Sequence, residues 1–329
     1  MTTIYLIRHA EAEGNLYRRC HGHYDSTVTD NGYHQIAALA RRFTRTHFDA
    51  VYASDLTRTK TTALAIARVH DLPLRLDPRL REVGVGAWED RTWAWLARFD
   101  RERLVAFNTD AARWRVDGAE TMADVRERML AALRDVVAAH PNATVAAVSH
   151  GMALRLLVGT LQGLTLAEID RTGHAENTAV TKLEADERGI RVVCRDDASH
   201  LPDALTTLRK QAWTRNAGGV EAGVWFAPDA SAAGRFDVMR EDERVGAVAV
   251  KPLGGGVAEI TELWLDESER GKGYGARLLG QAVSRARALG CDTLRSVRGG
   301  KPWERYFGYD EGYRIARFDA AWEATKNDG

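Results

Sequence analysis

The chain begins with residues 1–15, MTTIYLIRHAEAEGN, in which four apolar residues (4–7) run directly into Arg8 and His9. An apolar run of this length is typical of a buried β-strand. Cationic side chains rarely follow such a strand without a partner. Either Arg8 and His9 simply mark where the strand meets water, or they face an anion, and the rest of the chain has to distinguish the two.

Up to about residue 200, short apolar runs alternate with amphipathic helical patterns. The runs predict strands at residues 4–7, 51–53, 145–148, 179–183 and 190–194, and the periodic patterns predict helices at residues 32–43, 56–69, 121–140 and 152–161. Strand–helix alternation of this kind predicts an α/β three-layer sandwich with a mostly parallel sheet and helices on both faces.

Composition excludes several classes of protein. The chain has 329 residues, enough for two domains, with 45% hydrophobic and 28% charged residues, which is ordinary for a soluble globular protein. A net charge of +0 argues against nucleic-acid or membrane partners, and no apolar stretch approaches the ~18 residues of a membrane span. Cys20, Cys194 and Cys291 lie far apart, which suits a reducing compartment. We therefore expect a cytoplasmic protein, and the oligomeric state stays open.

The second part of the chain has a different pattern. Residues 203–219 show no strong period and end in Asn-Ala-Gly-Gly, which predicts domains at 1–203 and 220–329 joined by a linker at 204–219. Further on, strands are expected at residues 221–226, 235–240, 245–250, 257–265 and 293–297, and a helix at 275–289.

Polar residues follow three of the predicted strands of the first domain. The first strand leads to Arg8 and His9, the second to Arg58 in the first turn of a helix, and the third to His150. The carboxyl ends of parallel strands share one edge of a sheet, and helix N-termini at that edge favour anions. Because arginine forks match phosphate oxygens, the pattern favours a phosphate site.

Four segments in this order resemble the motifs of the histidine phosphatase superfamily, in its phosphoglycerate-mutase-like branch. They are LIRHAE (6–11), SDLTRT (54–59), REVGVGAWE (81–89) and VSHG (148–151). The resemblance runs from residue 1 to about 200.

The resemblance implies the chemistry of the site. His9 attacks phosphorus and becomes a phosphohistidine, while Arg8, Arg58 and His150 surround the phosphoryl oxygens. Glu82 protonates the leaving oxygen and later activates water. The attacking imidazole must be neutral, so a backbone carbonyl should hold its other nitrogen. The cations leave no need for a metal, and the expected substrate is a small phosphorylated metabolite. Glu82 as an exposed loop acid is the alternative.

Two further residues are candidates for substrate or phosphate binding. Asn15 matches the family's asparagine after the first motif, and His23 lies in a loop, residues 22–29, that borders the substrate in the family. Arginine is more frequent in the family at the position of His23, which leaves specificity open. A metal site at Cys20, His21 and His23 lacks a distant fourth ligand.

The segment from residue 88 to 118 helps to decide whether the first domain is a phosphatase or a mutase. It is compact and contains Trp88, Trp93, Trp95 and Trp114, whereas mutases of the family usually carry a longer insertion here. We therefore expect a phosphatase, with a phosphomutase as the alternative, and expect most of these tryptophans to pack a helical cap.

The glycine-rich loop RGKGYG (270–275) follows a predicted strand and opens a helix. Successive amides in such a loop can hold a pyrophosphate. A dinucleotide fold would need a parallel strand before the loop and an acid at the end of the next strand. The next strand, 293–297, ends without that acid, and the preceding strands are predicted to form hairpins.

Residues 262–279 and 308–313 resemble motifs of GNAT-type N-acetyltransferases, and the resemblance covers about residues 220–320. It implies a smaller α+β domain that binds acetyl-CoA. The implied cofactor-binding residues are Leu263, Leu265, Arg270, Gly271, Lys272, Gly273, Tyr274 and Gly275.

Whether this domain transfers acetyl groups stays open. Residues 227–234 are too few for the two helices that build the family's acceptor site. Glu259 or Glu262 as a base and Tyr306 or Tyr309 as an acid are candidates only. The alternatives are an N-acetyltransferase, a CoA-sensing domain and a purely structural one.

Overall fold

The computed structural model describes residues 1–211, 220, 221, 223–296, 313 and 314. Two compact units make up the chain. Unit 1 comprises Met1–Ala12, Cys20–Glu89 and Asp100–Val220, and unit 2 comprises Glu13–Arg19, Asp90–Phe99 and Glu221–Gly329. The domain limits at residues 203 and 219 stay predictions.

Unit 1 is built on a six-stranded sheet of order β3-β2-β4-β1-β5-β6. Its strands are β1 (Thr2–Arg8), β2 (Ala50–Ala53), β3 (Leu74–Leu76), β4 (Thr144–Ser149), β5 (Val180–Asp186) and β6 (Gly189–Asp197). β3, β2, β4 and β1 pair in parallel, and β5 and β6 are antiparallel. The predicted, mostly parallel sheet is therefore confirmed. The three-residue β3 was not predicted, because so short a strand leaves no apolar run.

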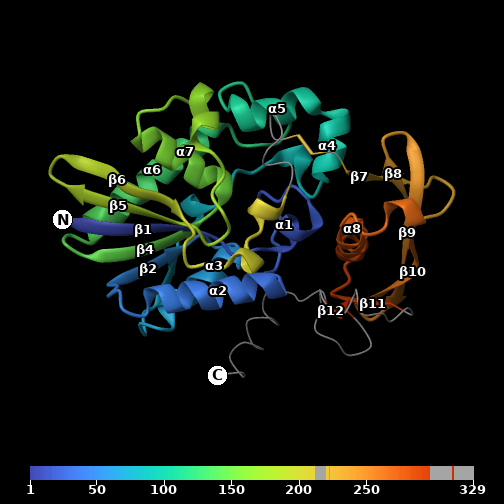
Figure 1. Ribbon diagram of the computed structural model, residues 1–329, viewed down its shortest axis with the longest axis horizontal. Helices are drawn as coiled ribbons and strands as arrows, with labels where there is room; N and C mark the ends of the chain where they lie inside the picture. The colour runs from blue at the N-terminus through green and yellow to red at the C-terminus, as the bar shows by residue number, and fades with distance from the viewer. Residues whose placement is uncertain (212–219, 222, 297–312, 315–329) are drawn as a thin grey trace. The chain divides into compact units, whose positions relative to one another are not determined.

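Helices cover both faces of this sheet, as Figure 1 shows, with α2 and α3 on one face and α6 and α7 on the other. The helices of unit 1 are α2 (Asp30–Phe43), α3 (Thr57–Ala67), α5 (Arg101–Thr109), α6 (Met122–Ala139) and α7 (Gly151–Leu161). Short 3-10 turns lie at Pro78–Leu80, Gly86–Trp88, Leu166–Thr172, Asp203–Leu205 and Leu208–Lys210. The hydroxyls of Thr29 and Thr121 accept N–H bonds at the starts of α2 and α6, which fixes where these helices begin. The three-layer sandwich is confirmed.

Two tryptophans of the compact segment pack as expected. Trp88 and Trp114 are buried, with ring centroids 5.5 Å apart in an edge-on arrangement. Phe107 of α5 lies 5.3 Å from Trp114 and 5.8 Å from Trp88. The three rings form the apolar centre of this part of unit 1.

Unit 2 contains a second six-stranded sheet, of order β12-β11-β10-β9-β8-β7. Its elements are α1 (Glu13–Tyr17), α4 (Trp93–Phe99), β7 (Val224–Pro228), β8 (Arg235–Arg240), β9 (Glu243–Gly254), β10 (Val257–Leu265), a 3-10 turn at Glu267–Glu269, α8 (Tyr274–Ala288), β11 (Thr293–Ser296) and β12 (Tyr313–Arg314). Leu278, Leu279 and Val283 of α8 are buried in one apolar cluster with Val248 and Ile260 of the sheet. β7 and β8 form a direct antiparallel pair, so the expected lack of helices between these strands is confirmed.

Within the described residues, no single helix is long and apolar enough to cross a membrane. The bent pair formed by Gly151–Leu161 and Leu166–Thr172 meets the requirements of length and composition alone.

Candidate active site

Three strand ends of unit 1 meet at one edge of the sheet. Arg8, the last residue of β1, is in register with Ser149 at the end of β4, and the N–H of His9 donates to the Ser149 carbonyl at 3.0 Å. The rings of His9 and His150 lie 5.2 Å apart. Arg58, in the first turn of α3, donates from Nε to Nδ1 of His150 at 3.2 Å. The predicted convergence of these residues is thus present in the fold.

His9 is held in one orientation. Its Nδ1 lies 2.7 Å from the Ala10 carbonyl, and because a carbonyl only accepts, Nδ1 carries the proton and leaves Nε2 as the basic nitrogen. Its own carbonyl accepts from Nδ2 of Asn177 at 2.9 Å. Burial, then the charges of Arg58 and Arg8, hold the pKa of the His9 imidazole well below its usual value. The ring is therefore neutral at physiological pH, as a nucleophile requires.

Arg58 is a buried cation that donates to main-chain carbonyls as well as to His150. Its Nη1 donates to Tyr24 O at 3.0 Å, and its Nη2 donates to Gly22 O at 2.7 Å and to His21 O at 3.4 Å. Burial lowers the pKa of this guanidinium, although arginine stays charged in proteins. The carbonyls orient the charge without neutralising it, which suits the binding of an anion.

The Glu89 carboxylate fixes the loop that supplies those carbonyls. It accepts N–H bonds from three successive residues, Gly22 at 3.1 Å, His23 at 2.7 Å and Tyr24 at 3.0 Å. It also accepts from the N–H of Val85 at 3.3 Å. The carbonyls of the same loop then point to Arg58, so Glu89 acts on Arg58 through the main chain.

His150 is oriented by two neighbours. Nδ1 accepts from Arg58, and Nε2 lies 2.7 Å from Oγ of Ser54, which in turn lies 2.8 Å from Oγ1 of Thr59. Burial, followed by the charge of Arg58, holds the pKa of His150 well below its usual value. Ser54 and Thr59 belong to the second sequence motif, but no local pattern indicated a role for their hydroxyl groups.

Glu82 is half-buried rather than exposed, so the alternative of a solvent-exposed loop acid is wrong. Its carboxylate accepts from the N–H groups of Met152 at 3.0 Å and Ala153 at 2.9 Å, in the first turn of α7, and from Val83 at 3.0 Å. The carboxyl group is thereby tied to the helix that begins directly after His150.

Arg8 lies beside the same helix. Its Nε is 3.5 Å from the position that a Cβ atom on Gly151 would take, and its Nη1 donates to the Ala175 carbonyl. The guanidinium of Arg8 therefore lies within van der Waals distance of the start of α7.

The two candidates for substrate or phosphate binding belong to different units. Asn15 lies in α1, which belongs to unit 2, and its role stays a prediction. His23 lies at the site, but its Nε2 is 2.9 Å from the main-chain oxygen of Glu82 and 3.5 Å from Oε2 of Glu120. The described residues hold no group of three or more His, Cys, Asp or Glu side chains that could bind a metal.

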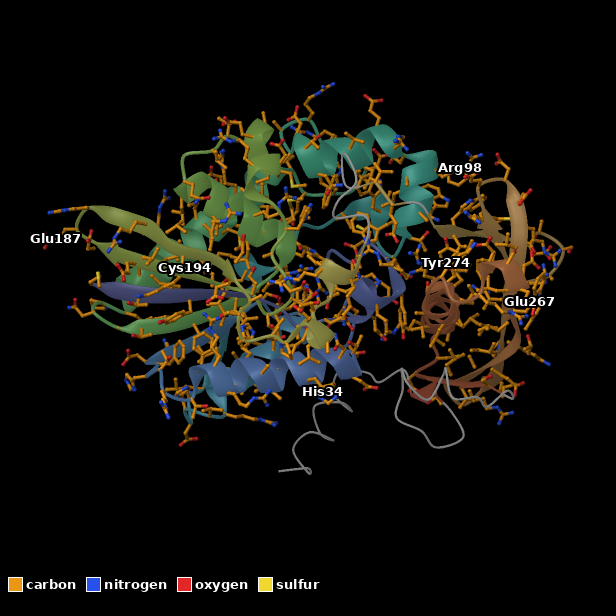
Figure 2. The ribbon with its side chains drawn as sticks, viewed as in Figure 1. His34, Arg98, Glu187, Cys194, Glu267 and Tyr274 are labelled. Atoms are coloured by element: carbon orange, nitrogen blue, oxygen red, sulfur yellow. The ribbon has the colours of Figure 1, made fainter. Side chains whose placement is uncertain are left out.

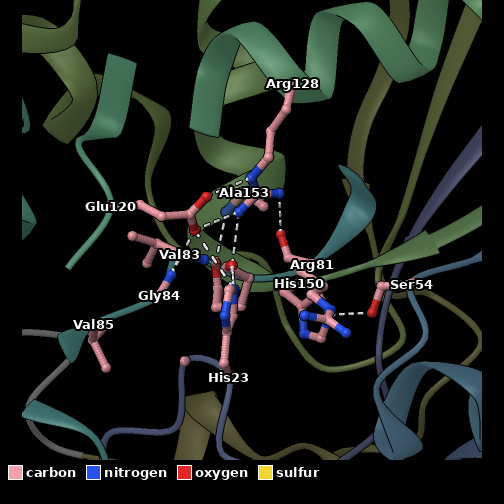
Figure 3. A network of polar contacts seen from close by, with 12 residues as sticks. His23, Ser54, Arg81, Val83, Gly84, Val85, Glu120, Arg128, His150 and Ala153 are labelled. Atoms are coloured by element: carbon pink, nitrogen blue, oxygen red, sulfur yellow. Dashed lines mark hydrogen bonds and ion pairs between the residues drawn. The ribbon is translucent and has the colours of Figure 1, made fainter. Parts of the chain in front are cut away.

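Two residues near Glu82 were missed by sequence reasoning, namely Glu120 and Arg128. Arg128 donates to three carbonyls of the segment that contains Glu82, and it pairs with Glu120 (Figure 3). A single arginine within a helical pattern carries no signal by which it could have been found.

The glycine-rich loop of unit 2 connects β10 to α8, and Tyr274 is the first residue of that helix (Figure 2). Gly271 and Gly273 have φ values of +77° and +82°, which favour glycine. A Cβ atom added to Gly271, Gly273 or Gly275 would meet nothing within 4 Å. Arg270 donates from Nε to the Leu265 carbonyl at 3.1 Å.

The remaining cofactor candidates lie on or beside this loop. Lys272 pairs with Glu269 at 3.0 Å. Leu265 is buried and Leu263 half-buried on β10.

The candidate acid–base groups of unit 2 are already engaged or lie outside the described residues. Hydrogen bonding to Arg235 lowers the pKa of Glu262, with Nε of Arg235 at 2.7 Å from Oε2. Glu259 pairs with Arg295 at 3.1 Å. Tyr306 and Tyr309 lie outside the described part of the chain.

Comparisons with known proteins agree with the folds of both units. The chain belongs to the histidine phosphatase superfamily (branch 1), whose family model matches residues 4–198, and residues 203–300 match the acetyltransferase (GNAT) family. The recognition of two fused domains is thus confirmed.

Individual relatives match the histidine phosphatase part. The probable phosphoglycerate mutase GpmB of Erwinia tasmaniensis is 33% identical over 216 residues, covering 64% of this chain and 100% of the relative. The structure of Bacillus stearothermophilus YhfR matches with 30% identity and a TM-score of 0.59, over 61% of this chain and 99% of that one. The mycobacterial glucosyl-3-phosphoglycerate phosphatase, solved with VO3, matches with 26% identity and a TM-score of 0.55, over 58% of this chain and 96% of that one.

Proposed function

We propose that unit 1 is a metal-independent phosphomonoester hydrolase that works through a phosphohistidine at His9 and acts on a small phosphorylated metabolite. The observation that carries the proposal is the state of His9. Its Nδ1–H is held by the Ala10 carbonyl at 2.7 Å, and its lowered pKa keeps Nε2 unprotonated.

The reaction follows from these groups. Nε2 of His9 attacks phosphorus, the N–P bond forms and the P–O bond to the leaving group breaks, while Glu82 gives its proton to the departing oxygen. Water then attacks phosphorus as Glu82 takes back a proton, and the N–P bond breaks to release inorganic phosphate and neutral His9. Arg8 and Arg58 stabilise the phosphoryl oxygens in both steps. Positioned acid catalysis of this kind contributes ~10²–10⁴-fold.

Two points support a hydrolase over a mutase. The segment after the glutamate motif is compact, with Trp88 and Trp114 packed into its interior rather than forming an extended insertion. The mycobacterial structural relative is named as a phosphatase. The GpmB relative is named as a probable phosphoglycerate mutase. A phosphomutase is therefore kept as an alternative outcome of the test.

The test is release of phosphate from a panel of phosphorylated metabolites by the intact chain. We expect hydrolysis by the native protein, none by His9→Ala, and normal rates for His47→Ala, a matched change of a surface histidine. Labelled phosphate should appear on the native protein in acid-labile, base-stable form and not on His9→Ala. Undiminished hydrolysis by His9→Ala would overturn the nucleophile. Transfer of phosphate between positions of one substrate, with little free phosphate, would establish the mutase instead.

For unit 2 we propose binding of acetyl-CoA, with its pyrophosphate on the amides of residues 271–275. The residues fit this group because the three glycines leave the backbone open to close approach and the loop ends at the N-terminus of the 15-residue helix α8, which favours negative charge. Bound acetyl-CoA supplies an activated acetyl group. N-acetylation of an amine, CoA sensing and a structural role remain to be separated.

Calorimetry with acetyl-CoA tests this second proposal. Gly275→Val is the informative variant, because position 275 lies inside α8 and the added side chain meets no protein atom within 4 Å at its Cβ. We expect heat from the native protein and much weaker binding by Gly275→Val. No heat from the native protein would favour a structural domain.

A further inference from the structure

Arg128 donates hydrogen bonds to the main chain around Glu82, the proposed acid. The Arg128 side chain, on α6, is only 17% exposed. Its Nη1 donates to the carbonyls of Arg79 and Arg81, each at 2.7 Å, and its Nη2 donates to the carbonyl of Glu82 at 2.8 Å. Figure 3 shows the side chain reaching from the helix into this turn of the chain. One side chain therefore ties three carbonyls within four residues to a helix.

Glu120 connects Arg128 to the main chain that follows Glu82. Its carboxylate accepts from Nε and Nη2 of Arg128, both at 2.9 Å, and Oε2 also accepts from the N–H of Gly84 at 2.7 Å. Partial burial raises the pKa of Glu120, but the bonds from Arg128 and Gly84 outweigh it and leave the pKa lowered. Glu120 thus links Arg128 to the residue two positions after Glu82.

His23 supplies a second donor to the Glu82 carbonyl. Its Nε2 lies 2.9 Å from that oxygen, and because the oxygen only accepts, Nε2 carries a hydrogen. Both lone pairs of the carbonyl are then used, one by Arg128 and one by His23. This contact places His23 on the main chain of Glu82.

We infer that Arg128, together with Glu120 and His23, is a positioning group that sets where the Glu82 carboxyl meets the leaving oxygen. The inference rests on the proposed function. The Glu82 side chain is anchored to α7 by Met152 and Ala153, and its main chain is anchored to α6 by Arg128. Both anchors are needed, because an acid transfers its proton only within hydrogen-bond reach of the leaving atom.

The dependence on the leaving group tests this role. Arg128→Met and the milder Arg128→Lys are compared on an alkyl phosphate, whose oxygen needs a proton to leave, and on an aryl phosphate of an acidic phenol, whose oxygen does not. Because a misplacement of about 1 Å costs on the order of 10²-fold, we expect kcat/KM for the alkyl phosphate to fall by about that factor in Arg128→Met. The aryl phosphate should lose far less, and Arg128→Lys should lie between.

A control variant and a double variant test whether the effect of Arg128 is specific and acts through Glu82. Arg126→Met removes an arginine from the same helix whose guanidinium pairs with the adjacent Glu127, and it should leave both substrates unaffected. In a Glu82→Gln background, Arg128→Met should add little to the loss on the alkyl phosphate, since residues that act through one another are not additive. Thermal unfolding confirms that each variant is folded. If Arg128→Met is not folded, the comparison is made with Arg128→Lys.

The outcomes separate the inference from the proposed function. If His9→Ala still hydrolyses both substrates, the phosphohistidine mechanism is wrong. A different result would overturn the positioning role alone. In that result, His9→Ala is inactive and Glu82→Gln slows the alkyl phosphate more than the aryl phosphate, but folded Arg128 variants slow both substrates equally. Their losses of kcat/KM would also multiply with that of Glu82→Gln in the double variant.

Discussion

At the scale of single residues, the site depends on keeping a buried histidine neutral beside two arginines. Water would stabilise the imidazolium, but His9 is only 6% exposed, and the positive charges of Arg58 and Arg8 further disfavour protonation. In the proposed mechanism, the same cations that would bind the phosphoryl group therefore also keep His9 neutral and able to attack. Binding and activation share one electrostatic cause.

This arrangement predicts an unusual titration of His9. An ordinary histidine gains its proton near pH 6.5, whereas the imidazole of His9 should stay neutral well below that pH. NMR of ¹³C-labelled histidine in the free protein measures this directly, with the His9 signal identified by its loss in His9→Gln. We expect no change of that signal between pH 7.5 and 5.5. A midpoint near pH 6.5 would show that burial and the arginines do not control the ring.

At the scale of elements, the loop at residues 22–24 acts as a connector between two charged side chains. Its N–H groups face the Glu89 carboxylate and two of its carbonyls, those of Gly22 and Tyr24, face Arg58. A loop used on both sides has little room to shift. Gly22 is the tightest point, because a Cβ atom there would lie 2.3 Å from Val83 O and 2.5 Å from Oε1 of Glu89.

Gly22→Ala should therefore impair both stability and activity. The methyl group must push the loop away from backbone that cannot yield, which typically costs about 1–3 kcal/mol. The same shift moves the Gly22 carbonyl away from Arg58, so kcat/KM should fall as well. Urea unfolding and steady-state kinetics measure the two effects.

Gly163→Ala is the control for this substitution. Gly163 has a φ of +80° and open space around its Cβ position, and it lies just beyond the C-terminal end of α7, whereas the site lies at the other end. Alanine in this left-handed conformation costs roughly 1–2 kcal/mol, and kinetics should not change. Equal kinetic losses in the two variants would contradict the role of the loop.

At the scale of the whole molecule, buried neutral histidines make stability depend on pH. Burial and the charge of Arg58 lower the pKa of His150, burial and Arg58 lower that of His9, and burial with Arg42 lowers that of His200 to about 4. In the unfolded chain these groups gain protons near pH 6.5. Below that pH the unfolded state binds more protons than the folded state, so acid favours unfolding.

The free energy of unfolding should thus fall as the pH drops from about 6.5 toward 4. Each group that stays neutral in the fold contributes a slope of about 1.4 kcal/mol per pH unit. Carboxylates such as Asp197, whose pKa is about 2, add to the loss only at lower pH. Urea midpoints at pH 7 and pH 5 measure the effect, and His200→Gln should show a smaller drop. Equal midpoints at the two pH values would refute the linkage.

Local patterns were enough to predict much of the site. The apolar runs before Arg8, Arg58 and His150 indicated strands, and parallel strands end at one edge of a sheet, so the meeting of these residues could be expected from sequence. The glycine-rich loop before α8 was likewise visible, because left-handed turns select glycine. By contrast, β3 was missed because three residues form no period.

The amino-acid sequence was enough to predict most strands and helices in their order and the polar residues at the strand ends, because these depend on patterns only a few residues long. Only the tertiary structure showed that Glu89 holds the loop facing Arg58 and that Arg128 holds the main chain of Glu82. It also showed that His23 contacts the Glu82 carbonyl. These contacts join residues 46 to 67 positions apart, and such pairs are set by how the elements pack, which no local pattern encodes.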